Sequence, residues 1–146
     1  MACDARIKVR SDPGLLQAVR GLIDCYLDSR GYNDGESREN VVQAVDEACT
    51  NAIRHAYHGD CNQFIEIRLK SDGEWIEVVV CDWGEQADPA QFQQDRRSDG
   101  DESGGLGVQF LYKVFDQVYF QPGSKCGNCV IMRLAQPPAV QAPDED

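Results

Sequence analysis

Apolar residues recur with a helical period in three stretches of the chain. The clearest is 41–58, VVQAVDEACTNAIRHAYH, whose apolar residues follow the i, i+3, i+4, i+7 spacing of an amphipathic helix. Ser37 is a plausible N-cap for this central helix, and Gly59 a stop. A second helix is predicted over 13–30, with Asp12 as its N-cap and Gly31 as its stop. A third is predicted to follow the run 104–107, GGLG, and to bury Val108, Leu111, Val114 and Phe115.

Alternating apolar and polar residues predict five strands. Residues 6–10 are typical of a short edge strand, and 63–70 and 74–82 are predicted to form an antiparallel hairpin around Ser71-Asp72-Gly73. The second hairpin strand is almost continuously apolar, so we expect it to be central in the sheet. Two more strands are predicted near 117–121 and 128–135.

Two stretches have no apolar period. Residues 85–103 are long, polar and highly charged, which favours a mobile lid inside a domain that spans 1–135. Residues 136–146, QPPAVQAPDED, are predicted to be a disordered acidic tail.

The polar face of the central helix carries residues that suit catalysis. Glu47 and Asn51 are four residues apart, so they stack one turn apart, with Arg54 and His55 close to the same stripe. A carboxylate can take a proton from a hydroxyl group, and an amide oxygen can bind magnesium. The competing interpretation is a solvated outer face, which is the more common situation for such residues taken alone.

Two further motifs point to a nucleotide. Asp82-Trp83-Gly84 ends the apolar strand, where a carboxylate could accept a hydrogen bond from an exocyclic amine such as that of adenine and Gly84 could let the base approach. Gly104-Gly105-Leu106-Gly107 precedes a helix, whose free N–H groups suit a phosphate. Each motif alone is weak, since turns and helix starts also use these residues.

The order of the motifs is specific. A helix with Glu-x-x-x-Asn, a strand ending in Asp-x-Gly, a lid and a Gly-x-Gly helix start resemble the GHKL (Bergerat-fold) ATP-binding superfamily, most closely its anti-sigma factor and serine-protein kinase branch. The resemblance implies a two-layer α/β sandwich with a mixed five-stranded sheet and about three helices on one face. The sequence departs from the family's pattern at two places. Glu85-Gln86 stands where a second glycine or proline often follows Asp-x-Gly, and Ser103 stands where some members carry an arginine before the glycines.

The resemblance also implies residue roles. Glu47 would be the general base, Asn51 the magnesium ligand, and Asp82 the residue that reads adenine. The remaining residues of the three motifs would bind ATP: Arg54, His55, Gly84, Gly104, Gly105, Leu106, Gly107 and Val108.

The activity implied by the resemblance is that of an ATP-dependent protein serine/threonine kinase and anti-sigma factor. Such a protein works by partner switching: it binds a sigma factor or similar regulator and phosphorylates a small STAS-type antagonist, usually as a homodimer. Two alternatives are a nucleotide-binding module without kinase activity and a detached histidine-kinase catalytic domain. The residue Glu47 favours the kinase, because a binding module does not need a base.

Composition narrows the class of protein. The 146 residues suit one domain, and no apolar run is long enough for a membrane helix or a signal peptide, so we expect a cytoplasmic protein. A net charge of −11 would repel nucleic acid and anionic membranes, and a basic protein partner is easier to accommodate.

Cysteine usage fits the same compartment. Seven cysteines are an odd number, and Cys25, Cys49 and Cys81 fall at apolar positions, as reduced thiols acting as small hydrophobes would. Cys126 and Cys129 have the spacing of half a zinc site, which His55, His58 and Cys61 could complete. The alternative is an ordinary turn at Gly127-Asn128, and we prefer it because the sequence has no second Cys-x-x-Cys motif.

Overall fold

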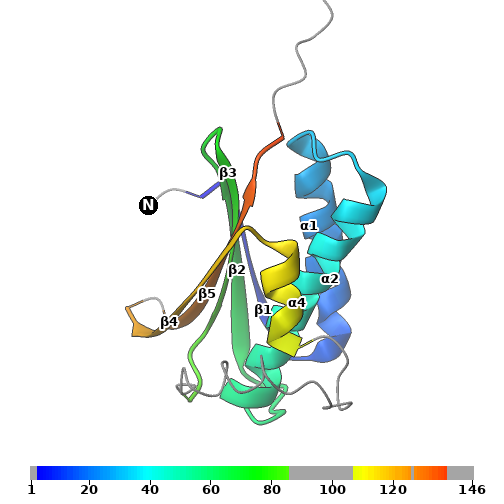
Figure 1. Ribbon diagram of the computed structural model, residues 1–146. Helices are drawn as coiled ribbons and strands as arrows, with labels where there is room; N and C mark the ends of the chain where they lie inside the picture. Colours follow the sequence, from blue (N-terminus) through cyan, green and yellow to red (C-terminus); the bar gives the residue numbers. More distant parts are fainter. Residues whose placement is uncertain (1–2, 86–106, 126, 138–146) are drawn as a thin grey trace, which may run out of the picture.

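The computed structural model describes residues 3–85, 107–125 and 127–137. The chain forms two layers, a five-stranded sheet and a layer of helices packed on one of its faces (Figure 1). The helical layer holds α1 (Leu16–Ser29), α2 (Gly35–Asn51) and α4 (Gly107–Val114), together with the short 3-10 helix η1 (Pro13–Leu15) and the π-helical turn η2 (Ala52–Ala56). The two-layer α/β fold, with helices on one face of five strands, is as predicted.

The sheet has the order β1-β2-β3-β5-β4, with β3 in the middle. Its strands are β1 (Ala5–Arg10), β2 (Phe64–Ser71), β3 (Trp75–Asp82), β4 (Gln117–Ser124) and β5 (Gly127–Ala135). Every neighbouring pair is antiparallel, so the expectation of a mixed sheet was wrong.

The connections explain the antiparallel pairing. Two helices, α1 and α2, lie between β1 and β2, and the chain returns to the end of the sheet that it left, where the Ser11 N–H donates to the Gln63 carbonyl at 2.8 Å. The connection from β3 to β4 includes α4, and these two strands run the same way, but β5 lies between them. Parallel neighbours are therefore avoided.

Most element ends fall close to their predicted places. Asp12 caps the first helical turn through a 2.9 Å bond from the Gly14 N–H, and Gly31 and Gly59 both adopt positive φ after helices, as predicted. The start of the central helix differs. It begins at Gly35 with Asp34 as N-cap, and Ser37 lies inside the first turn, where its hydroxyl donates to the Asp34 carboxylate at 2.6 Å.

The hydrophobic core lies between the sheet and the helices. The predicted inner face of the central helix is buried, except that Val42 is only half-buried. In α4, Val108 and Leu111 are buried as predicted, Phe115 just after it is buried too, and Val114 is half-buried. Cys49 and Cys81 are buried, but Cys25 is exposed, because it lies on the outer side of α1. This packing holds the polar edge of α2 beside the end of β3.

Several predictions fall outside the described residues: the lid from residue 86 onward, Gly104, Gly105, Leu106, and the tail from residue 138 onward. Among the helices that are described, none combines the length and apolar character needed to cross a membrane.

Candidate nucleotide site

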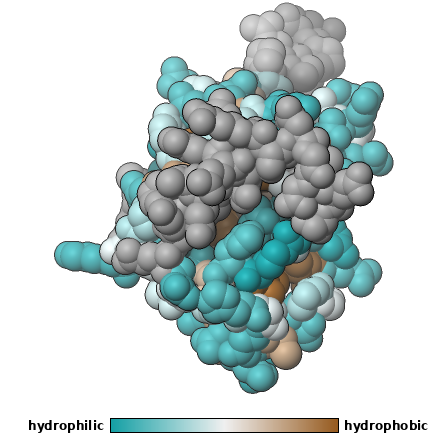
Figure 2. Space-filling view, turned by 60° about the horizontal axis from the view of Figure 1, so that its bottom comes forward, coloured by the Kyte–Doolittle hydropathy of each residue, from teal (hydrophilic) through white to brown (hydrophobic). Residues whose placement is uncertain are grey.

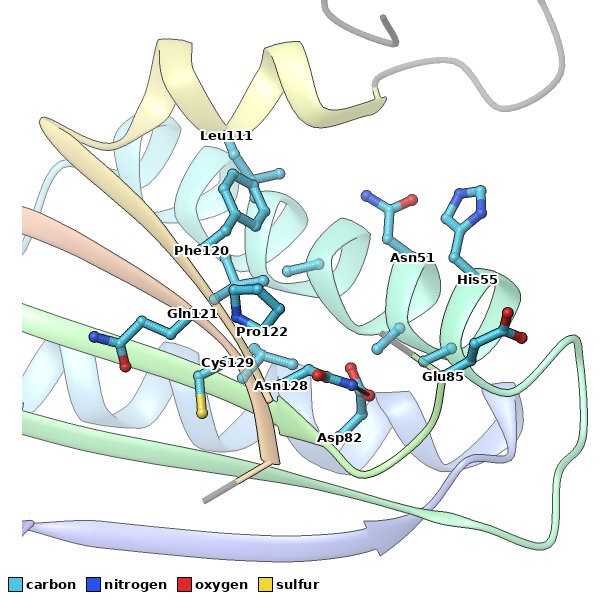
Figure 3. A pocket seen from close by; sticks show the side chains of 15 residues that line it. Asn51, His55, Asp82, Glu85, Leu111, Phe120, Gln121, Pro122, Asn128 and Cys129 are labelled. Carbon is cyan, nitrogen blue, oxygen red and sulfur yellow. Dashed lines mark hydrogen bonds between the residues drawn. The ribbon is translucent and has the colours of Figure 1, made fainter. Parts of the chain in front are cut away.

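A pocket opens between the helical layer and the sheet, at the end of β3 (Figure 3). Its apolar lining comes from both layers: Ala48, Ala52, Ala56, Val80, Leu111, Phe120, Pro122 and Val130. Its polar residues include Asn51, His55, Asp82, Glu85, Gln121 and Asn128. On the face drawn in Figure 2, most of the described residues are hydrophilic, and hydrophobic residues show mainly in recesses. The pocket combines apolar walls with a few placed polar groups, as small-molecule sites do.

Asp82 is the buried polar group of this pocket. It is the last residue of β3, and strand alternation turns its side chain toward the helices, where only 8% of it is exposed. Its Oδ1 atom accepts two hydrogen bonds, from Asn128 Nδ2 at 2.9 Å and from the Gly84 N–H at 3.0 Å. Both bonds use the same oxygen, so among the contacts of the described residues Oδ2 is left as an acceptor for a ligand.

The pKa of Asp82 reflects this environment. Burial raises the pKa of the carboxyl group above its usual range, and the bonds from Asn128 and Gly84 lower it by less. Burial therefore outweighs the two donors.

Gly84 holds the turn after Asp82 against the end of the central helix. A Cβ atom at this position would overlap the Ala56 carbonyl group, and the next residue, Glu85, donates its N–H to the Ala56 oxygen at 3.0 Å. From the sequence, we predict that Gly84 lets an adenine base approach the main chain. The close neighbour in the structure is the Ala56 main chain.

Glu47 and Asn51 lie one turn apart on α2. Both are half-buried, and Asn51 lines the pocket. Glu47 Oε1 accepts a hydrogen bond of 3.2 Å from the N–H of Gly107, the first residue of α4, whose φ is +56°. The carboxylate and the start of α4, which are far apart in sequence, are thus brought together.

Of the other predicted site residues that the structure describes, some line the pocket and some do not. His55 is exposed and lines the pocket beside Asn51, as Figure 3 shows. Arg54 is exposed and is not among the residues that line the pocket. Val108 is a buried residue of α4 and is not among the residues that line the pocket.

Asn128 was missed at the sequence level. Its Nδ2 donates to Asp82 and to the Gly84 carbonyl at 3.1 Å, and its Oδ1 accepts from the Gly123 N–H at 2.8 Å. The sequence showed it only as part of a Gly-Asn turn. The signal that could have found it is the strand register, in which Asp82 and Asn128 are direct partners.

The described residues of the zinc alternative have other surroundings. His58 Nε2 lies 2.7 Å from Glu85 Oε2, Cys61 is exposed, and Cys126 lies outside the described residues. Within the described part of the chain, no three His, Cys, Asp or Glu residues form a group that could hold a metal ion.

Comparison with known proteins agrees with this geometry. Residues 9–134 match the family model of the histidine kinase-like ATPase domain. The serine-protein kinase RsbW of Bacillus subtilis is 34% identical over 122 residues, which cover 79% of this chain and 76% of the relative. RsbW of Bacillus velezensis is 30% identical, over 81% of this chain and 78% of the relative.

A solved structure shares the fold. The crystal structure of the RsbU and RsbW domains of Rv1364c from Mycobacterium tuberculosis superposes with a TM-score of 0.60 at 17% identity. The match covers 92% of this chain and 32% of the longer one, so the chain spans about a third of it. The chain therefore belongs to the histidine kinase-like ATPase domain family, and within that family it is similar to the RsbW serine-protein kinases.

Proposed function

We propose that the chain is an ATP-dependent serine/threonine protein kinase and anti-sigma factor that acts by partner switching. In this role it binds a sigma factor or similar regulator and phosphorylates a small STAS-type antagonist. The observation that supports the proposal is that Asn51 and Asp82 line one pocket, while Glu47, one turn before Asn51 on α2, accepts a hydrogen bond from Gly107 at the start of α4. The names of the relatives, serine-protein kinases, support the same activity.

The residues present fit ATP with magnesium. Asp82 Oδ2 would accept a hydrogen bond from the exocyclic amine of adenine, with Asn128 holding the carboxylate in place. The apolar walls suit the faces of the base. The phosphates would lie toward Gly107 and the glycines before it, and Asn51 would offer its amide oxygen to the cation. His55 could contact the nucleotide from the same edge.

Phosphoryl transfer would then depend on how the Glu47 carboxylate is positioned beside the nucleotide and the incoming serine. Bound magnesium and ATP supply the phosphoryl group and the neutralising charge. Glu47 would accept the proton of a partner serine hydroxyl, and the hydrogen bond from Gly107 to its Oε1 holds the carboxylate at the start of α4. One residue thus links the central helix, the phosphate end of the site and the incoming serine.

The rival functions make different products. A binding module without kinase activity would hold ATP and transfer nothing. A histidine-kinase catalytic domain would produce an acid-labile phosphohistidine. We expect incubation with radiolabelled ATP, magnesium and a STAS-type antagonist recovered by pull-down to produce acid-stable phosphoserine on the antagonist. An acid-labile product, or transfer of no label with an antagonist that binds, would overturn the kinase proposal.

The proposal also covers the oligomeric state, the compartment and the class of partner. We infer a homodimer in the cytoplasm, with protein partners instead of nucleic acid, since the net charge of −11 opposes phosphate backbones.

The magnesium role of Asn51 can be tested directly. We expect Asn51→Ala to abolish the magnesium dependence of ATP affinity, because a methyl group cannot replace an oxygen ligand. Nucleotide affinity is measured across a magnesium titration. Thr50→Ala is the matched control, since the Thr50 hydroxyl donates to the Asp46 carbonyl of its own helix and lines no part of the pocket. A variant Asn51→Ala with the parent's magnesium response would remove this role.

A further inference from the structure

Two thiols lie side by side on the neighbouring strands β3 and β5, near the end of β3. Cys81 of β3 and Cys129 of β5 are direct partners in the antiparallel register, and their Sγ atoms are 2.9 Å apart. The next residue of β3, Asp82, and the preceding residue of β5, Asn128, turn their side chains into the nucleotide pocket. Because side chains alternate along a strand, the two thiols lie on the opposite face of the sheet. Figure 3 shows the sulfur of Cys129 directed away from the pocket.

The two thiols differ in access. Cys81 is fully buried, whereas Cys129 keeps 6% of its surface exposed. Cys129, through its side-chain contact, and burial together raise the pKa of the Cys81 thiol. An oxidant in solution therefore meets Cys129 first, and Cys81 stands behind it as a second sulfur within contact distance.

We propose that Cys81 and Cys129 are an oxidation site that hydrogen peroxide converts from a dithiol to a cross-strand disulfide. In the first step the Cys129 sulfur attacks one peroxide oxygen, the O–O bond breaks, and a sulfenic acid and one water form. In the second step the Cys81 sulfur attacks the Cys129 sulfur, the S–O bond breaks, and a second water leaves. The two sulfurs lose two electrons in total, the peroxide gains them, and both thiol protons end in water.

The geometry favours the second step. A disulfide bond is about 2.05 Å long, so the sulfurs need to approach by less than about 1 Å. Their strands are already hydrogen-bonded neighbours in the required register. Proximity of this kind offsets the poor nucleophilicity of a buried thiol, because the reacting atoms are held together. In a reducing compartment the pair would rest as thiols and close only under oxidative load.

The disulfide would staple β3 to β5 beside the Asn128–Asp82 hydrogen bond, on the other face of the sheet. Cys129 is among the residues that line the pocket, but its sulfur points away from it (Figure 3), and Cys81 does not line it, so we expect nucleotide binding to survive oxidation. The cross-link joins residues 48 positions apart, which restricts the unfolded chain. We therefore expect the melting temperature to rise by about 5–15 °C on oxidation and to fall back with dithiothreitol.

Peptide mapping of the whole protein tests the pairing. The protein is treated with hydrogen peroxide, alkylated without reductant, digested with trypsin and analysed by mass spectrometry. Cys81 lies in the peptide 71–96, and Cys129 shares the peptide 126–133 with Cys126. We expect these two peptides to be linked in the parent and in Cys126→Ser, and unlinked in Cys129→Ser. In Cys81→Ser, dimedone should trap the sulfenic acid on Cys129.

Outcomes that overturn the proposal are equally specific. One is a link that persists in Cys129→Ser and vanishes in Cys126→Ser. Another is an alkylated Cys81 under conditions that oxidise the exposed Cys25 and Cys61, which serve as internal references for peroxide exposure. Circular dichroism checks that each serine variant is folded, and Cys126→Ser decides the question even if a buried serine prevents folding.

Discussion

At the scale of single residues, Asp82 serves two opposed demands. Burial makes its charge costly, yet the charge is what would hold the amine of adenine. The Asn128 side chain and the Gly84 N–H compensate part of that cost through one oxygen, leaving the other for a ligand.

This conflict predicts a trade between affinity and stability in Asp82→Asn. The amide can still accept both hydrogen bonds, but its NH2 group would face the adenine amine as a second donor. We expect ATP affinity to fall by about 1–3 kcal/mol, roughly 5- to 150-fold. Calorimetric titration with ATP measures the change, and GTP serves as the comparison nucleotide. If the parent binds GTP as tightly as ATP, Asp82 does not read adenine.

The same variant should be more stable than the parent at neutral pH. The pKa of Asp82 is raised in the folded state, so ionisation favours unfolding. The penalty is absent below the carboxyl group's unfolded pKa of about 4 and is complete above its folded pKa. We therefore expect the stability advantage of Asp82→Asn, measured by urea unfolding, to vanish at acid pH and to grow as the pH rises through the folded pKa.

Glu47 separates an enzyme from a binding module. Glu47→Gln keeps an oxygen that can accept from the Gly107 N–H, but it cannot take a proton at neutral pH. We expect phosphoryl transfer to slow by about 10²- to 10⁴-fold while ATP binding survives. Some transfer should remain, because positioning and magnesium carry much of the reaction.

Single-turnover transfer to the antagonist measures this effect. The control is Glu39→Gln, an exposed glutamate of the same helix. A Glu47→Gln protein that transfers phosphate at the parent's rate would make Glu47 a solvated surface residue, the alternative that the sequence left open.

At the scale of elements, the turn after β3 packs tightly against the end of the central helix. A Cβ atom on Gly84 would lie 2.7 Å from the Ala56 carbonyl carbon and 2.8 Å from its Cβ atom. These neighbours are main chain or attached directly to it, so they cannot rotate away. We expect Gly84→Ala to cost about 2–4 kcal/mol of unfolding free energy and to weaken ATP binding, because Asp82 moves with the turn.

Gly21 is the matched control for that substitution. It lies within α1, and a Cβ atom there would meet nothing within 4 Å. Gly21→Ala should stabilise the protein by about 0.5–1 kcal/mol through helix propensity. Urea unfolding of both variants compares the two changes, and an equal effect at both positions would contradict the packing argument.

The elements also show what sequence patterns can and cannot predict. The predicted helices and strands exist because periodicity follows directly from which side chains face the core. The antiparallel pairing of β2 with β3 and the central place of β3 were predicted and are confirmed. The place of β5 between β3 and β4 was not predicted, since it depends on how distant segments of the chain return to the sheet. The motifs name Glu47, Asn51 and Asp82 as candidates but do not indicate Asn128, whose contact with Asp82 exists only through the register of β3 with β5.

At the scale of the whole molecule, the helices cover one face of the sheet and charged rows occupy part of the other. Glu66 lies 2.7 Å from Arg68, and Glu77 pairs with Arg133 at 2.8 Å and with Lys70 at 3.5 Å. Both glutamates are buried despite their charge, because these cations surround them. The pocket therefore opens at the end of a sheet that is packed on one side and held by ion pairs on the other.

Because both layers contribute to the pocket, a nucleotide should stabilise the whole fold. Its walls come from α2, η2, β3, α4, β4 and β5, so unfolding any of them would release the ligand. At about 100 times the dissociation constant, a ligand that binds only the folded state adds about 2.7 kcal/mol, or roughly 5–10 °C in melting temperature for a chain of this size. We expect this shift with ATP and magnesium, a smaller one in Asp82→Asn, and little with GTP. Differential scanning calorimetry at rising ATP concentration measures it, and the melting temperature should increase with the logarithm of concentration. Equal shifts for ATP and GTP would mean that the site binds the phosphates without reading adenine, whereas the lack of any shift would mean that the folded chain does not bind the nucleotide.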